Sequence, residues 1–210
     1  ISLSTGLRIG EICALKWSDI DTDNAIVTVS RTIERIYIVE GEEKHTELVI
    51  NTPKTKNSYR EIPITKELLA IVKPLKKVVN NEYYVLTNEE KPTEPRTYRN
   101  YYKQLIKIKQ ITQFIHKHYA EKITLQNIAD NLHISISDCS HSFKKFMKES
   151  IFEYILHYRI QQSLYLLQDK ELSILQISLK VGFSSTSYYS KLFKKYMKMT
   201  PKEYRRLLKN

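Results

Sequence analysis

An internal repeat limits the folds that this chain of 210 residues can adopt. The hexapeptide Ser142–Met147 (SFKKFM) returns fifty residues later as Leu192–Met197 (LFKKYM). A similar lead-in precedes each copy, QNIA at 126–129 and LQIS at 175–178. Both copies have apolar residues at helical spacing, so the repeat predicts two versions of one small helical module.

The second copy carries clear start and stop signals for helices. Ser173 and Gln176 form a predicted capping box, in which a hydroxyl accepts a backbone N–H and an amide reaches back. Gly182 supplies the left-handed residue that ends the first helix. A second helix is predicted over about Thr186–Met197. A third restarts at Thr200–Glu203, with threonine as cap and proline at the first helical position. The order is helix, tight turn, helix and a further capped helix.

The helix predicted over Thr186–Met197 has two different faces. Its apolar residues are expected to pack inward: Tyr189, Leu192, Phe193, Tyr196 and Met197. The opposite face carries short polar side chains and lysines: Ser187, Ser190, Lys191, Lys194 and Lys198. Such a face on the second helix of a helix-turn-helix fits the DNA major groove. The alternative is a solvated basic face on an ordinary helical bundle.

The outward positions of the first copy match those of the second. The pairs are Ser137 with Ser187, Ser140 with Ser190, His141 with Lys191, Lys144 with Lys194, and Lys148 with Lys198. Packing alone does not explain two basic faces in the same register. The repeat therefore favours nucleic-acid binding over a solvated bundle.

Charge is distributed unevenly along the chain. The formal net charge is +11. Residues 1–106 contain 16 Lys and Arg against 15 Asp and Glu, whereas residues 107–210 contain 18 against 8. This asymmetry predicts a polyanion-binding surface in the C-terminal half. Nucleic acid is favoured over a lipid surface, because the cations lie opposite an aromatic core rather than beside an insertable apolar face.

Other function classes find little support. No apolar run approaches the ~20 residues of a membrane helix, and no signal peptide opens the sequence, so we expect a cytoplasmic protein without membrane contact. Cys13 and Cys139 are far apart, and Cys139 falls on the inward face of its helix, as a small buried residue would. The six histidines form no ligand cluster. We expect no metal and no cofactor.

The N-terminal half is expected to be α+β. Its strands are predicted to form a meander of three antiparallel strands. The expected helices are Ile9–Trp17, Thr65–Val79 and Arg96–Ile108. Pro74 would kink or end the second of these helices. The expected strands are Ala25–Val39, Glu47–Asn51, Tyr59–Ile64 and a short one at Tyr83–Thr87. A continuous helix over 97–119 would join this half to an all-α C-terminal half.

The run from about Ile111 to Leu208 resembles the DNA-binding domain of AraC/XylS-type bacterial transcription regulators. The resemblance is carried by Ile123–Ala129, Phe152–Ile155, Arg159-Ile160, Val181–Ser184 and Thr200–Arg205. It implies two helix-turn-helix units joined by a long helix, Phe152–Gln168. Their recognition helices would enter successive major-groove segments about one turn (~34 Å) apart.

This resemblance assigns expected roles to the outward residues. Ser137, Ser140 and His141 would read one segment, and Thr186, Ser187, Ser190 and Lys191 the next. Phosphates would be bound by Lys144, Lys145, Lys194, Lys195 and Lys198. The first unit departs from the family pattern at Asp138, Cys139, His141 and Ser142, where Asp138 adds a negative charge near the groove. We therefore expect the second unit to dominate discrimination.

The first 105 or so residues resemble tyrosine recombinases of the phage-integrase family. Ser4–Asp21 is similar to the first conserved box, and Thr52–Ile64 to the β-hairpin that carries a lysine. By this resemblance Arg8 would hold the scissile phosphate and Lys54 would protonate the leaving 5′-oxygen, whereas Glu11 would be structural.

The rest of that catalytic set is missing from the sequence. A covalent phosphotyrosine mechanism needs a nucleophile and a second arginine in an H-x-x-R box. No histidine at 116, 118, 133, 141 or 157 has an arginine three residues on. The two adjacent tyrosines at 188 and 189 are better explained as the packing pair of a recognition helix. We predict no enzyme activity, with Arg8 and Lys54 as vestiges.

Together these observations predict a partial recombinase domain over 1–106 and an AraC-type DNA-binding domain over 107–210. The expected function is sequence-specific regulation of transcription through double-stranded DNA. The alternatives are a remnant of a site-specific recombinase that lacks its nucleophile, and an interaction module that binds without reading sequence. The sequence begins without methionine inside the first box, as a fragment or a truncated reading frame would. It identifies no effector and leaves a homodimer open.

Overall fold

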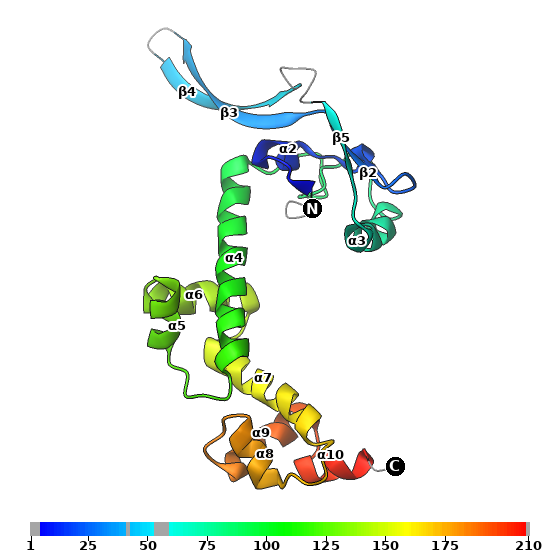
Figure 1. The fold of residues 1–210 in the computed structure, drawn as a ribbon. Helices are drawn as coiled ribbons and strands as arrows, with labels where there is room; N and C mark the ends of the chain where they lie inside the picture. The colour runs from blue at the N-terminus through cyan, green and yellow to red at the C-terminus, as the bar shows by residue number, and fades with distance from the viewer. Residues whose placement is uncertain (1–4, 41–42, 53–58, 209–210) are drawn as a thin grey trace. The chain divides into compact units, whose positions relative to one another are not determined.

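The structure is a computed structural model, and it describes residues 5–40, 43–52 and 59–208. The chain divides into two compact units, Ile1–Lys103 and Gln104–Asn210 (Figure 1). The first unit is α+β and the second is all-helical, as the sequence predicts.

The described residues of the first unit form two small antiparallel sheets and a short helix near its start. The helix α2, Ile9–Ala14, is followed by the 3-10 turn η1, Trp17–Asp19. One sheet has the order β1-β2-β5, formed by Ile20–Asp21, Ile26–Val29 and Arg60–Pro63. The other pairs β3, Thr32–Glu40, with β4, Glu43–Asn51, so that Thr32 lies opposite Asn51 and Glu40 opposite Glu43.

The predicted meander is wrong in its strand connections. The stretch predicted as one strand, Ala25–Val39, is two strands that belong to different sheets. The break falls at residues 30–31, where the Arg31 guanidinium donates to the Asp19 carboxylate at 2.6 Å. Val27 and Val29 then pack in one core, and Ile33 packs in another. Alternation along the sequence cannot show this change of sheet, because both strands alternate.

A second helix covers the larger core of this unit. Helix α3, Lys66–Lys76, begins at Thr65, whose side chain accepts the Leu68 N–H, and it ends two residues after Pro74. It buries Leu68 and Val72 against a cluster that includes Trp17. The short strand predicted at Tyr83–Thr87 is not formed, because this stretch makes turns and a single bridge between Lys16 and Tyr84.

The continuous helix predicted over 97–119 is confirmed. Helix α4, Pro95–His118, has 24 residues and no acidic side chain. Its C-terminal part buries Ile108, Ile111 and Ile115 in the core of the second unit.

In the part of the second unit that the structure describes, six further helices follow α4. These are α5, Leu125–Leu132; α6, Ile136–Met147; α7, Ile151–Leu166; α8, Ile174–Lys180; α9, Thr186–Met197; and α10, Pro201–Leu207. A serine or threonine precedes each helix and accepts a backbone N–H in its first turn: Thr124, Ser135, Ser150, Ser173, Ser185 and Thr200. Such caps are typically worth about 1 kcal/mol each. The capping boxes predicted at Ser173 and Thr200 are both present.

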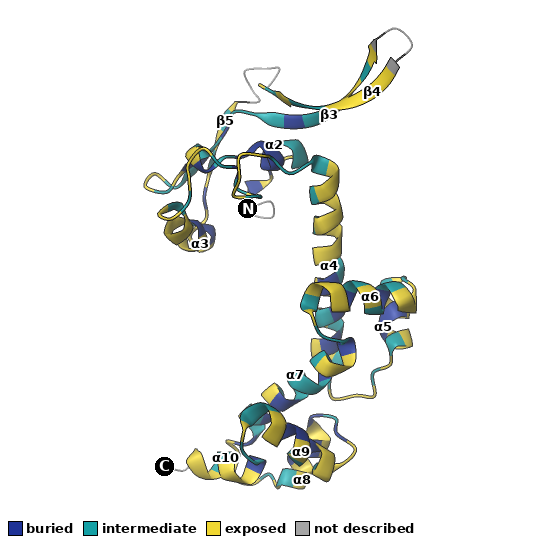
Figure 2. Cartoon of the chain, turned by 180° about the vertical axis from the view of Figure 1, so that it is seen from behind, coloured by how far each residue is buried: buried dark blue, intermediate teal, exposed yellow. Residues whose placement is uncertain are grey.

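Two hydrophobic clusters lie within this unit, one for each copy of the repeat. Cys139 and Phe143 of α6 pack in the first, and Tyr189 and Phe193 of α9 pack in the second. Helix α7 contributes to both, as Ile155 lies in the first cluster and Ile160 in the second. It corresponds to the predicted linking helix, Phe152–Gln168. Exposed residues alternate with these buried ones along α6 and α9 (Figure 2).

Candidate nucleic-acid interface

Each copy of the repeat folds as a helix, a tight turn and a second helix. The turn after α5 uses His133 in a left-handed conformation (φ 53°), and the turn after α8 uses Gly182 (φ 90°). Each of these residues lies seven positions after the first residue of its repeat's lead-in, at 126 and 175. Gly182 was predicted from the sequence, whereas the left-handed histidine was not. The second turn demands glycine, because a Cβ there would lie 2.7 Å from the carbonyl oxygen of Ala120.

Helices α6 and α9 present most of the predicted contact residues to solvent. The exposed ones are Ser137, His141, Lys144, Lys145, Ser187, Lys191, Lys194, Lys195 and Lys198. Ser140, Thr186 and Ser190 are half-buried. On the inward faces Cys139, Phe143, Tyr189 and Phe193 are fully buried. The two-faced character predicted from the sequence is therefore present in both helices.

The two helices also end alike. Lys148 and Lys198 both adopt left-handed conformations (φ 64° and 62°), and their N–H groups bond to the carbonyls of Lys144 and Lys194 at 3.0 Å. These ends place lysines near the last turn of each helix, where the dipole favours positive charge.

The Asp138 carboxylate is compensated within the protein. The Lys107 ammonium of α4 donates to Asp138 Oδ2 at 2.6 Å, and the Ser142 hydroxyl donates to Oδ1 at 2.8 Å. These bonds from Lys107 and Ser142 hold the pKa of Asp138 below its usual value. The unpaired negative charge expected near the groove is thus a paired one, and Lys107, 31 residues away, was not identified from the sequence.

Thr186 is tied to the neighbouring helix. Its hydroxyl lies 3.0 Å from the hydroxyl of Ser178, which is buried in α8. This bond joins the start of α9 to α8, so Thr186 has a structural contact in addition to the reading role predicted for it.

The two adjacent tyrosines of α9 differ, so the prediction of a packing pair holds only for the second. Tyr189 is fully buried, and burial raises the pKa of its hydroxyl to about 12. Tyr188 is 49% exposed, and its ring packs edge-on against that of Phe183, with the two ring centroids 6.1 Å apart. A buried tyrosine with a raised pKa is a poor nucleophile.

Arg159 of α7 connects α4 with the second copy of the repeat. Its guanidinium donates to the carbonyls of Tyr119 and Glu121 at 2.7 Å each and lies 5.8 Å from the ring centroid of Phe183. The sequence indicated Arg159 only as part of the family resemblance, and its partners are separated from it by about forty residues. This contact holds the end of α4 against the turn of the second copy.

The recombinase-like residues lie at the start of α2. Arg8 is exposed, and its backbone N–H donates to Glu11 Oε2 at 2.7 Å. Glu11 is only 6% exposed and accepts two bonds from Arg60, at 2.8 and 2.9 Å. Burial raises the pKa of Glu11, but the bonds from Arg60 and Arg8 outweigh it, so the net pKa lies below the usual value. The structural role expected for Glu11 agrees with this geometry, while Lys54 lies outside the described residues.

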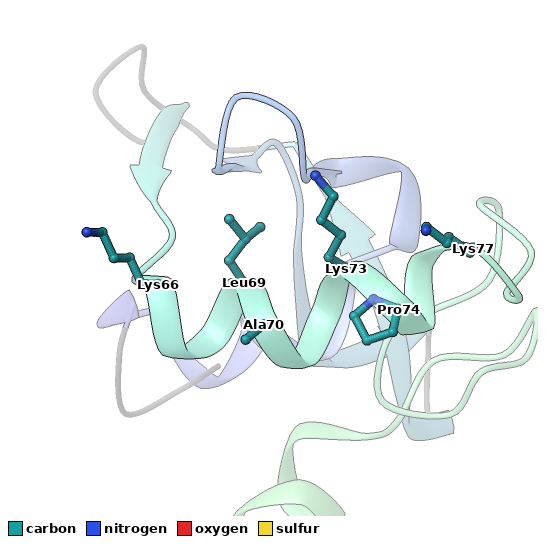
Figure 3. A pocket seen from close by; sticks show the side chains of 6 residues that line it. All are labelled: Lys66, Leu69, Ala70, Lys73, Pro74 and Lys77. Carbon is teal, nitrogen blue, oxygen red and sulfur yellow. The ribbon is translucent and has the colours of Figure 1, made fainter.

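A shallow groove of about 440 Å³ runs along α3 (Figure 3). It is lined by Lys66, Leu69, Ala70, Lys73, Pro74 and Lys77. Lys73 lies 3.7 Å from the Asp23 carboxylate. Among the described residues that line the groove, lysine is the one type that carries an ionisable side chain. Among the described residues, no helix has the length and apolar character needed to cross a membrane.

Two known families match the chain. Residues 1–131 match the phage integrase family, and residues 128–207 match a helix-turn-helix domain.

Curated relatives and solved structures are similar to the chain as well. The uncharacterized HTH-type transcriptional regulator YdeC of Bacillus subtilis is 38% identical over 152 residues, which cover 72% of this chain and 48% of that protein. The Msm operon regulatory protein of Streptococcus mutans is 33% identical over 160 residues, covering 76% and 52%. The C-terminal domain of AraT, a response regulator from Geobacillus stearothermophilus, is 30% identical with a TM-score of 0.46, covering 48% and 84%.

The chain spans about half the length of the curated relatives it matches. Those relatives are described as regulators of transcription rather than as enzymes. The chain belongs to the phage integrase family in its N-terminal part, and its C-terminal part is a helix-turn-helix DNA-binding domain of the AraC type.

Proposed function

We propose that this protein is a sequence-specific, double-stranded-DNA-binding regulator of transcription. One observation carries the proposal: α6 and α9, the second helices of two repeated helix-turn-helix modules, each bury an apolar face and expose a serine and lysine face. A solvated bundle would not require the same outward residues fifty positions apart. The similarity to curated transcription regulators supports this reading.

We assign two kinds of contact to the exposed residues. Lysines bind phosphates, and each phosphate neutralised contributes roughly −0.9 to the slope of log affinity against log salt concentration. The phosphate-binding set is Lys144, Lys145, Lys194, Lys195 and Lys198. Base edges are read by Ser137, Ser140 and His141 in the first module and by Thr186, Ser187, Ser190 and Lys191 in the second. Lys191 can donate to guanine O6 or N7.

Selection of bound duplexes from a random-sequence library tests the proposal. A regulator is expected to enrich one motif and to bind it ~10³-fold or more tightly than a scrambled duplex of the same composition, at ~0.15 M salt. Equal binding of both duplexes would instead identify an interaction module that does not read sequence.

The second candidate is a recombinase remnant, favoured by the phage integrase match and by Arg8. We propose that this chain cleaves no strand, since the sequence offers no H-x-x-R box to supply the second arginine. Tyr189 is buried with a raised pKa, so this tyrosine is a poor nucleophile. The phosphate-binding arginine alone gives neither a nucleophile nor a complete cationic cradle.

A nicked suicide substrate tests this absence of cleavage. Such a substrate traps a covalent protein–DNA adduct when a phosphotyrosine forms, and no adduct is expected. A denaturation-resistant adduct that disappears when one tyrosine is changed to phenylalanine would establish cleavage.

We further propose a functional boundary near residue 106 and a cytoplasmic location, where DNA is accessible. The N-terminal part then serves to sense an effector, to form a dimer or to add nonspecific affinity for DNA.

A further inference from the structure

A polar link joins α4 to α6, the second helix of the first module. Lys107 of α4 is 20% exposed and lies 2.6 Å from the Asp138 carboxylate in the first turn of α6. Ser142, one turn later on α6, bonds the other carboxylate oxygen at 2.8 Å. All three side chains are partly buried, so the pair is less screened by salt than a fully exposed one.

The helix-turn-helix fold does not require this link. The repeat places Tyr188 and Leu192 of the second module at the positions of Asp138 and Ser142. Leu192 is buried and packs in the second core, and that module folds with neither a carboxylate nor a lysine partner there. The polar link is therefore specific to the first module, and the fold that the two modules share does not account for it.

The position of Asp138 supplies that explanation. It is the neighbour of Ser137 and lies one turn before His141, two residues to which we assign base contacts. Its side chain remains 44% exposed. A carboxylate free to rotate there would approach the phosphates of a bound duplex, and like charges brought together across an interface weaken binding. Its pairing with Lys107 cancels the charge and directs the carboxylate toward α4.

We infer that Lys107 is a positioning residue for DNA binding by the first module, which acts by holding and neutralising the Asp138 carboxylate. This inference rests on the proposed DNA-binding function. It assigns to α4 a part in DNA binding that acts through Asp138 and requires no contact between Lys107 and DNA.

A double-mutant cycle tests the inference. Wild type, Lys107→Met, Asp138→Asn and the double variant are compared for binding to a selected duplex and to a mixed-sequence duplex at ~0.1 M salt. Lys107→Met is expected to weaken binding about tenfold, because the carboxylate is released. The double variant is expected to bind within about twofold of wild type, since no carboxylate remains. Lys107→Arg, which keeps the charge, is expected to bind like wild type.

A matched control separates this effect from loss of net charge. Lys109 is exposed on α4 two residues away, and Lys109→Met removes the same charge without touching Asp138. It is expected to change affinity by less than about twofold. Thermal unfolding of all variants shows whether the fold is kept. Adding Asp138→Asn to Lys107→Met restores binding only if the released carboxylate causes the loss of affinity.

The inference is overturned if Lys107→Met binds like wild type, if Lys109→Met loses as much affinity, or if Asp138→Asn fails to restore binding. The affinity differences among these variants do not depend on whether the protein distinguishes one DNA sequence from another. If wild type binds selected and scrambled duplexes equally, the proposed function fails, while the cycle can still be measured on the mixed-sequence duplex.

Discussion

The chemistry available to each side chain of the candidate interface depends on its immediate neighbours. Lys191 is exposed on α9, so its ammonium is free to contact a base edge, whereas the Thr186 hydroxyl is hydrogen-bonded to the Ser178 hydroxyl. Asp138 is paired with Lys107, so its charge is largely cancelled. Residue type alone predicts none of these partners, because each comes from another helix.

Lys191→Ala is expected to weaken binding by ~1–3 kcal/mol and to relax the preference at one base pair, since a direct donor to a base is lost. His141→Ala, at the matching position of the first module, should cost less, because that module departs from the family pattern. Binding of both variants to the selected duplex and its single-base variants measures the ranking. A greater loss for His141→Ala would reverse the assignment of the dominant module.

Glu11→Gln is expected to destabilise the first unit by about 1–3 kcal/mol at pH 7, because it leaves Arg60 without its carboxylate partner. The folded-state pKa of Glu11 is lowered, so its stabilisation is complete above the usual glutamate pKa of about 4.3 and is lost as pH falls through the lowered value. Denaturant unfolding at several pH values should show the difference from wild type shrinking below pH ~4.

Glu61→Gln is the matched control for that series. Glu61 is exposed on β5, next to Arg60, and its substitution is expected to change the unfolding free energy by less than about 0.5 kcal/mol. A pH-independent difference for Glu11→Gln would show that its carboxylate charge is not what stabilises the unit.

Helices and strands differed in how far the sequence could predict them. Helices α7, α8, α9 and α10 begin within one residue of their predicted starts, because serine or threonine caps and local apolar stripes specify them. The prediction of the strands was wrong at residues 30–31, where the chain passes from one sheet to the other. Strand pairing depends on distant partners, such as Val27 with Ile62, that a local pattern does not reveal.

Gly182→Ala is expected to destabilise the second module by about 2 kcal/mol or more. The left-handed conformation disfavours a Cβ, and that atom would also lie 2.7 Å from the Ala120 carbonyl oxygen. Thermal unfolding of the full chain measures the loss. His133→Gly, at the equivalent turn of the first module, should leave stability unchanged or raise it. Equal behaviour of the two variants would contradict the close approach inferred at Gly182.

At the scale of the whole molecule, the excess positive charge coincides with the all-helical half of the chain. Residues 107–210 contain 18 Lys and Arg against 8 Asp and Glu. That asymmetry and the repeat predicted the candidate interface from sequence. The contacts of Lys107 and Arg159 could not be predicted, because their partners lie some thirty to forty residues away and no local pattern links them.

We propose that both modules bind one duplex at the same time, through α6 and α9. A hydroxyl-radical footprint of a selected duplex distinguishes this from binding by one module. Two protected segments are expected on one face of the duplex, about one helical turn (~34 Å) apart. His141→Ala should weaken protection of one segment, and Lys191→Ala should weaken protection of the other. A single protected segment, or uniform protection that neither substitution changes, would rule out simultaneous binding by the two modules.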